Sequence, residues 1–308
     1  MNSAGPPDLA VELGALRLAN PIIAASGTFG YGLEFAHLLN LDRLGGFVVK
    51  GLSAQPMDGA PAPRLSPTPA GMINAVGLQN VGVRAFVNEK LPALRHLKTA
   101  VIANVFGHAV EEYVEVLRIL EDAPGLAAYE LNISCPNVKR GGMQYGSDPS
   151  LTSEVVGAAR KAASKRPLWV KLSPQVTDIR VIARAAAEAG ADALTVANTY
   201  PAMSIDPVSR RSRLGNPTGG LSGPAIRPIT LRLVHEVSHS VHIPVIGLGG
   251  IETPSDVAEY LLAGSTAVQV GTASFADPAA CERLLDGLFS WCFDNNISNL
   301  NDLRGALL

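Results

Sequence analysis

Residues 129–147 combine reactive and polar side chains at a spacing that suits chemistry. The segment begins as a short apolar strand pattern and continues into a polar loop. Asn132, Cys135 and Asn137 supply an amide, a thiol and a second amide there. Pro136 biases Cys135 toward an extended backbone, so the thiol is expected just past a strand end, between two carboxamides. A thiol in that position predicts proton transfer or nucleophilic attack on a small polar ligand. The alternative is a half-buried cysteine that packs as a small apolar residue.

Two lysines lie at the ends of other apolar strand patterns. Lys50 follows the run 47–49, and Lys171 lies within the run 168–172. A cation at the end of an apolar strand needs an anionic or electron-rich partner to offset desolvation, so each lysine predicts such a ligand. The alternative for each is a buried ion pair with a neighbouring carboxylate. The residues at or just after the strand ends are Ser26, Lys50, Asn104, Asn132, Lys171, Asn198, Gly249, Gly250, Gly271 and Thr272.

Strand and helix patterns alternate along the chain. Near-continuous apolar strands separated by helices indicate a parallel sheet. Eight such units indicate an α/β protein with a closed (β/α)8 TIM barrel, and an open doubly wound sheet is the alternative. The expected strands are 21–25, 47–49, 101–103, 129–133, 168–172, 193–197, 244–247 and 267–270. The expected helices are 110–121, 151–164, 178–189, 226–240, 255–263 and 277–291.

Two segments fall outside this repeat. Residues 9–18 predict a short N-terminal β-hairpin that closes the barrel bottom. Residues 51–80 are rich in Pro and Gly and are too long for an ordinary strand-to-helix connection, so they predict a loop that serves as a lid or binding element. The chain, residues 1–308, is therefore expected to form one barrel domain.

Glycines follow the last two strands of the predicted barrel. Gly249-Gly250 and Gly271-Thr272 stand at these positions, and the segment 219–224 precedes another helix. Glycines after the seventh and eighth barrel strands let backbone N–H groups and a helix N-terminus hold a phosphate. The pattern predicts a phosphate-bearing cofactor or substrate.

Composition excludes several classes of protein. The 308 residues are 47% apolar and 17% charged, with a net charge of −2, so a large core is possible and a basic surface for nucleic acid is not. No apolar run approaches the 18 residues of a membrane span, and the N-terminus lacks the pattern of a signal peptide. The cysteines Cys135, Cys281 and Cys292 are too few for a four-thiolate cluster. We expect a reduced, cytoplasmic protein without a metal site.

The segment His235-Glu236-Val237-Ser238-His239 matches the H-E-x-x-H pattern of zinc hydrolases. It falls on a predicted helix outside the barrel strands, and His242 is too close in sequence to serve as the distant third ligand. The pattern is therefore interpreted as a helix surface and not as a zinc site.

Five segments together resemble the class 1 dihydroorotate dehydrogenase family. They are 25–30, 71–80, 132–138, 249–250 and 271–272. The resemblance extends from about residue 9 to residue 290. It implies an FMN-dependent (β/α)8 barrel that oxidises (S)-dihydroorotate to orotate in pyrimidine (UMP) biosynthesis.

Details of the same region resemble one branch of that family. Cys135, where class 2 members have serine, is similar to class 1, and residues 138–146 are more similar to the NAD-linked (1B) branch than to the fumarate-linked one. The NAD-linked branch implies a partner subunit that carries FAD and a two-iron, two-sulfur cluster. It also implies a homodimer of this chain joined to that iron–sulfur flavoprotein in a heterotetramer.

The resemblance also implies roles for individual residues. Cys135 would be the base that removes the C5 proton while hydride passes from C6 to FMN. The implied substrate-binding residues are Lys50, Asn74, Ala75, Val76, Gly77, Leu78, Asn132, Asn198 and Thr199. The implied FMN-binding residues are Ser26, Lys50, Gly51, Asn104, Asn132, Lys171, Ala197, Gly223, Gly249, Gly250, Gly271 and Thr272.

Two other functions stay open at this point. One is a related FMN enzyme that uses fumarate or acts on another pyrimidine. The other, from a different class, is a lyase or aldolase that forms a Schiff base through Lys50 or Lys171.

Overall fold

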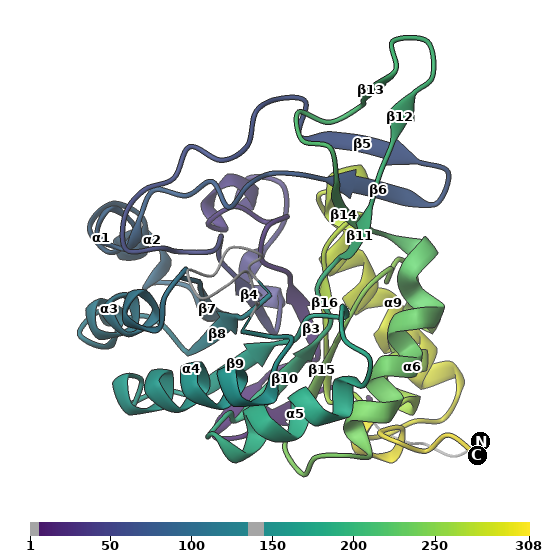
Figure 1. Cartoon of the computed structure of the whole chain (residues 1–308). Coiled ribbons are helices and arrows are strands. Elements are labelled where there is room, and N and C mark those ends of the chain that lie inside the picture. Colours follow the sequence, from purple (N-terminus) through teal and green to yellow (C-terminus); the bar gives the residue numbers. More distant parts are fainter. Residues whose placement is uncertain (1–5, 135–144) are drawn as a thin grey trace.

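The computed structural model describes residues 6–134 and 145–308, and its centre is a closed barrel of eight parallel strands (Figure 1). The strands follow one another around the barrel in chain order. The last strand pairs with the first, with Val268 opposite Ile22 and Val270 opposite Ala24, and so closes the barrel. The barrel strands are β3 (Ile22–Ala24), β4 (Gly46–Val48), β7 (Ala100–Val105), β8 (Ala128–Asn132), β9 (Leu168–Lys171), β10 (Ala193–Val196), β15 (Val245–Leu248) and β16 (Ala267–Val270).

Helices surround the barrel and cover the outer faces of its strands (Figure 1). Most strands are buried along their whole length because one side faces the barrel interior and the other side faces this helical layer. The helices are α1 (Val83–Ala85), α2 (Leu91–Leu94), α3 (Val110–Glu121), α4 (Pro149–Ala162), α5 (Ile179–Glu188), α6 (Arg227–Ser238), α7 (Pro254–Leu262), α8 (Ala273–Ala276) and α9 (Ala280–Asp294).

Local sequence explains where several of these helices begin. Asp148 and Asp178 cap α4 and α5 by accepting hydrogen bonds from backbone N–H groups of the first turn. Thr253 starts α7 in a capping box with Asp256. All eight predicted strands and all six predicted helices are present, with their ends shifted by up to three residues. The closed barrel is therefore confirmed, and the open sheet is wrong.

A second, antiparallel sheet lies over the carboxyl ends of the barrel strands (Figure 1). Its strand order is β11 (Tyr200–Ala202), β14 (Gly219–Ser222), β6 (Gly71–Asn74) and β5 (Leu65–Thr68). The prediction of a loop over 51–80 is thus wrong for residues 65–68 and 71–74. β6 pairs with β14 in the segment after β10, and β5 pairs with β6. The sequence of β5 and β6 has no sustained alternation of apolar and polar residues that would reveal them.

Smaller elements complete the structure. The predicted hairpin over 9–18 is present as β1 (Val11–Leu13) and β2 (Leu16–Leu18), and its turn residue Gly14 lies against Asp192, just before β10 begins. This contact places the hairpin at the amino ends of the barrel strands. A π-helical turn (Phe86–Lys90) joins α1 to α2, and β12 (Ile205–Asp206) pairs with β13 (Arg211–Ser212) at the tip of a projecting hairpin. Within the described residues, every helix is too short or too polar to cross a bilayer.

Candidate active site

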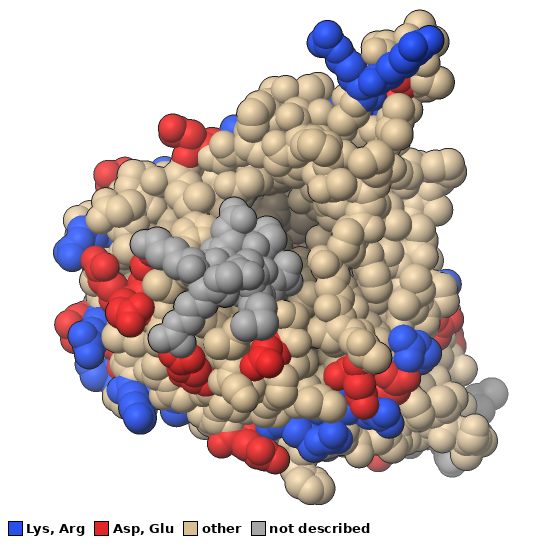
Figure 2. Space-filling view, viewed as in Figure 1, with Lys and Arg blue, Asp and Glu red and all other residues tan. Residues whose placement is uncertain are grey.

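A cavity of about 480 Å³ lies at the carboxyl ends of the barrel strands, next to the antiparallel sheet. The molecular surface is hollowed there, and the described residues around the opening are mostly neither acidic nor basic (Figure 2). The volume falls within the range of roughly 300–1,000 Å³ that is typical of small-molecule sites. The predicted site residues that line it are Ser26, Lys50, Gly51, Asn74, Ala75, Val76, Gly77, Leu78, Asn104, Asn132, Lys171, Ala197, Asn198, Thr199, Gly223, Gly249, Gly250, Gly271 and Thr272.

Cys135 is the one predicted site residue that lies outside the described residues. The residue before it, Ser134, is described and lines the cavity. The chain therefore leaves β8 at the cavity wall, where Asn132 ends the strand.

The two lysines reach the cavity from different strands. Lys171 ends β9 and is buried, and burial lowers the pKa of its ammonium group while the nearby Glu130 carboxylate raises it. Lys50 follows β4 and is half-buried, and burial and the positive charge of Arg64 lower its pKa against the opposing effect of Glu34. A carboxylate acts electrostatically on each lysine, but neither lysine forms an ion pair with a carboxylate among the described residues, so the ion-pair alternative is not supported there. Both lysines line the cavity and are available to a ligand.

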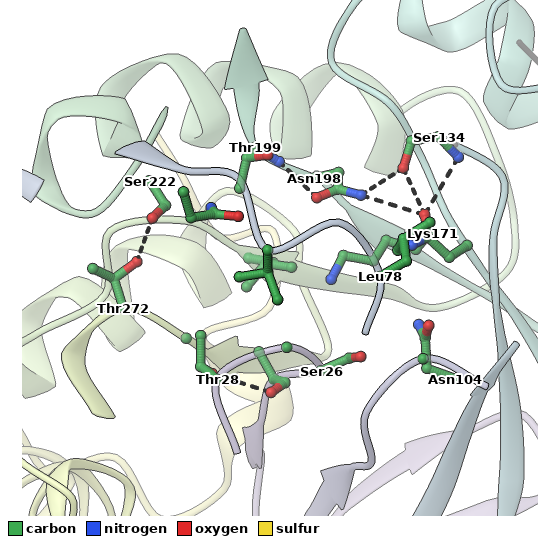
Figure 3. A pocket seen from close by; sticks show the side chains of 18 of the residues that line it. Ser26, Thr28, Leu78, Asn104, Ser134, Lys171, Asn198, Thr199, Ser222 and Thr272 are labelled. Atoms are coloured by element: carbon green, nitrogen blue, oxygen red, sulfur yellow. Dashed lines mark hydrogen bonds between the residues drawn. The ribbon is translucent and has the colours of Figure 1, made fainter. Parts of the chain in front are cut away.

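Asn132, Ser134 and Asn198 form a hydrogen-bonded cluster on one wall (Figure 3). The hydroxyl of Ser134 donates to Asn132 Oδ1 at 2.7 Å and accepts from Asn198 Nδ2 at 2.5 Å. The backbone N–H of Thr199 donates to Asn198 Oδ1 at 2.8 Å. These bonds fix both amide planes, and they occupy the oxygen of Asn132. Its NH₂ group is the part that can donate to an oxygen atom of a ligand.

Glycines form the opposite end of the cavity. Gly223, Gly249 and Gly250 have positive φ angles of 97°, 147° and 69°. A Cβ atom at position 250 would lie 2.6 Å from the carbonyl oxygen of Gly223, so the backbone is close-packed here and admits no side chain. Thr272 Oγ1 donates to Ser222 Oγ at 2.8 Å beside these glycines (Figure 3). Exposed backbone and hydroxyl groups of this kind suit an anion such as a phosphate.

The cavity also includes residues that were not predicted as site residues. They are Ala25, Gly27, Thr28, Met57, His108, Ser134, Asn216, Ser222, Ile226, Leu248 and Phe275. Ser134 could have been found because residues 132 and 134 point to the same side of an extended chain. His108, Asn216 and Phe275 carry no such local signal, since they follow strand ends at a distance or lie in connecting segments.

The remaining sequence motifs lie away from the cavity. His235 on α6 and His239 just after its end have tilted rings with centroids 4.3 Å apart, and Glu236 pairs with Arg232 on the same helix. Cys281 and Cys292 are buried on α9.

The fold and the cavity define a (β/α)8-barrel protein whose site combines amide, ammonium and anion-binding groups at the carboxyl ends of its strands. A family model described as "Dihydroorotate dehydrogenase" matches residues 8–291. The chain therefore belongs to the dihydroorotate dehydrogenase family of oxidoreductases.

Three full-length relatives illustrate this membership. The "Putative dihydroorotate dehydrogenase A (fumarate)" of Solibacter usitatus is 56% identical, over 98% of this chain and 99% of the relative. Two proteins named "Dihydroorotate dehydrogenase B (NAD(+)), catalytic subunit" are similarly close. That of Pelobacter propionicus is 52% identical over 98% of this chain and 99% of the relative. That of Geotalea uraniireducens is 51% identical over 99% of each.

Proposed function

We propose that this chain binds FMN and oxidises (S)-dihydroorotate to orotate in pyrimidine (UMP) biosynthesis. One observation carries the proposal: a single cavity joins two lysines, an asparagine cluster and a glycine-lined end, in a chain of the dihydroorotate dehydrogenase family. A Schiff-base lyase could also use a buried lysine and a phosphate-binding end, and the match to the dihydroorotate dehydrogenase family favours the dehydrogenase.

The residues of the cavity fit FMN. Gly223, Gly249, Gly250 and Gly271 line one end of the cavity without side chains, so their backbone groups are accessible to a phosphate. Asn104 Oδ1 is buried and has no hydrogen-bond partner among the described residues, so it can accept from an N–H group of a ligand. When bound, FMN supplies the hydride acceptor that protein side chains lack. The residues proposed to hold it are Ser26, Lys50, Gly51, Asn104, Asn132, Lys171, Ala197, Gly223, Gly249, Gly250, Gly271 and Thr272.

The proposed substrate contacts follow from charge and hydrogen bonding. The Lys50 ammonium pairs with the carboxylate of dihydroorotate, and Asn132 and Asn198 bond to the planar imide. Cys135 removes the C5 proton as a thiolate. A cysteine thiol becomes a usable base once its site lowers the pKa of the thiol below its ordinary value. The other proposed substrate-binding residues are Asn74, Ala75, Val76, Gly77, Leu78 and Thr199.

The proposal is tested by a visible spectrum of the purified chain, before and after anaerobic addition of dihydroorotate. Flavin bands that bleach on addition are the expected result. Flavin that stays oxidised would indicate that the substrate is a pyrimidine other than dihydroorotate. A folded chain that binds no added FMN would overturn the proposal, and trapping of a lysine adduct by borohydride would then support the lyase.

We further propose NAD+ as the terminal electron acceptor, reached through a partner subunit that carries FAD and a two-iron, two-sulfur cluster. Of the three relatives described above, two bear the NAD-linked name and one bears the fumarate-linked name, so the acceptor needs its own test. The chain reduced by dihydroorotate is mixed with fumarate or with NAD+, each alone and with the iron–sulfur flavoprotein. Reoxidation by NAD+ that requires the flavoprotein supports the proposal, and rapid reoxidation by fumarate alone contradicts it.

Orotate binding is expected to weaken as the pH rises toward the ordinary lysine pKa of 10.5. Burial and Arg64 lower the pKa of Lys50, so its ammonium form, which pairs with a carboxylate, is lost at a lower pH than in a free lysine. The dissociation constant of orotate is measured by flavin absorbance across the alkaline range. Lys50→Met should bind about 10- to 100-fold more weakly at neutral pH and show no alkaline loss. Wild-type binding that is independent of pH would contradict the role of Lys50.

Ser134→Ala is expected to raise the dissociation constant of orotate by about tenfold, because it removes the two shortest hydrogen bonds that hold the amides of Asn132 and Asn198. FMN content should change little. Ser240→Ala, which removes a hydroxyl bonded only within the end of α6, is the matched control. Equal orotate affinity in the two variants would show that the serine does not organise the wall.

Gly250→Ala is expected to weaken FMN binding by about tenfold or more, since a side chain there strains the backbone and approaches the Gly223 carbonyl. FMN affinity is measured by fluorescence titration of the flavin-free chain. Gly157→Ala is the control, because that glycine lies in α4 with open space around its would-be Cβ atom. A Gly250 variant that binds FMN as tightly as the control would exclude a phosphate site at this end.

A further inference from the structure

A layer of polar side chains fills the barrel interior directly below the cavity. Glu130, Thr195 and Gln269 come from β8, β10 and β16, which are alternate strands of the barrel, as expected for one interior layer. All three have no exposed surface, and none of them lines the cavity. None of these three residues is among those proposed to touch FMN or dihydroorotate.

Glu130 is the centre of this layer. Its Oε2 accepts hydrogen bonds from Thr195 Oγ1 at 2.8 Å and from Gln269 Nε2 at 2.5 Å, and its Oε1 accepts from Asn104 Nδ2 at 2.8 Å. Removing a carboxylate from water is costly, and apolar residues would fill the same interior at no such cost. The three donors offset part of the cost. The hydrogen bond between Asn104 and Glu130 connects the buried layer to the cavity wall, because Asn104 lines the cavity.

That bond determines how Asn104 faces the cavity. An ionised carboxylate only accepts hydrogen bonds, so the NH₂ group of Asn104 must face Glu130. Its Oδ1 is then left as an acceptor, buried and without a hydrogen-bond partner among the described residues. Glu130 thus decides that Asn104 presents a carbonyl oxygen, and not an amide N–H, to a ligand.

Glu130 also acts on Lys171. The lysine is buried at the end of β9, and its strand pairs with β8 so that Lys171 lies opposite Asn132, two residues beyond Glu130. Burial lowers the pKa of Lys171, and the negative charge of Glu130 is the effect that opposes this change. Without that charge, the neutral amine would be favoured.

We propose that Glu130 is a positioning residue for the flavin site, which holds the Asn104 carbonyl toward the cavity and keeps the positive charge on Lys171 at its wall. The inference rests on the proposed function, because it concerns the same site. Glu130 itself touches neither FMN nor dihydroorotate. It acts through Asn104 and Lys171, which line the cavity.

The test compares holoenzymes of the wild type and Glu130→Gln, a change that removes the charge and keeps the size. We expect FMN affinity to fall by about tenfold or more, because losing the Glu130 charge favours the neutral amine of Lys171 and weakens the hydrogen bond that orients Asn104. We also expect a shift in the visible flavin bands and a more negative midpoint potential. Glu121→Gln, in a second buried glutamate at the far end of α3, should change none of these properties.

The outcomes separate the two proposals. A wild-type chain that neither binds FMN nor is reduced by dihydroorotate contradicts the proposed function itself. A functional wild type with unchanged affinity, spectrum and potential in Glu130→Gln overturns only the role of Glu130. If that variant does not fold, Thr195→Val and Gln269→Leu replace it, since each removes one hydrogen bond to the carboxylate and leaves the cavity wall intact. Smaller changes in the same direction support the inference, and unchanged spectra and affinities overturn it.

Discussion

Replacing Cys135 with alanine is expected to leave FMN bound and to lower turnover with dihydroorotate by about 10²- to 10⁴-fold, the usual contribution of a positioned general base. The proton at C5 would then have no acceptor, while the groups that line the cavity stay in place. The measurement is anaerobic reduction of the flavin by dihydroorotate in a stopped-flow instrument, together with the flavin content of each preparation.

Two further variants sharpen this result. Cys135→Ser should keep a little activity, with more at high pH, because a hydroxyl is a much weaker acid than a thiol and forms its anion less readily. Cys292→Ala removes a thiol buried on α9 and should retain full activity. Full activity in the Cys135→Ala variant would remove this residue from the mechanism.

Replacing Lys171 with methionine is expected to lower the rate of flavin reduction by about 10²- to 10³-fold, as removal of a preorganised electrostatic group commonly does. The change also removes the positive charge that lies near the buried Glu130 carboxylate, which should reduce the free energy of unfolding. Flavin content, reduction rate and denaturant unfolding are measured on the same preparation.

The double variant Lys171→Met/Glu130→Gln separates stability from chemistry. Removing both charges should recover much of the lost free energy of unfolding, because no unpaired charge remains in the barrel. The rate of flavin reduction should stay low. A single Lys171→Met variant with unchanged flavin content and reduction rate would make the lysine a structural residue.

The order of strands and helices could be predicted from the sequence with few errors. Each barrel strand is a short apolar run because it is buried on both faces, and helices such as α4, α5 and α7 begin at side chains that cap them locally. These are signals within a few residues. Because the carboxyl ends of such strands meet at one end of the barrel, the sequence alone could assign residues as far apart as Lys50 and Thr272 to one site.

The antiparallel sheet beside the cavity could not be predicted in this way. Asn74 on β6 donates its amide to the Gly220 carbonyl on β14, 146 residues further along the chain. Neither segment has the strand composition or alternation that would mark it in isolation. Their pairing depends on the barrel, which brings the connections after β4 and β10 together at one end.

The sequence by itself determined the barrel, the family and the residues at its strand ends. Only the tertiary structure decided that Glu130, Thr195 and Gln269 meet beneath the cavity and that Ser134 joins two asparagines. The physical reason is that local patterns reflect burial and backbone preference, which act within one element. The hydrogen bonds of a polar layer form between strands, and they depend on distances that exist only after the barrel has closed.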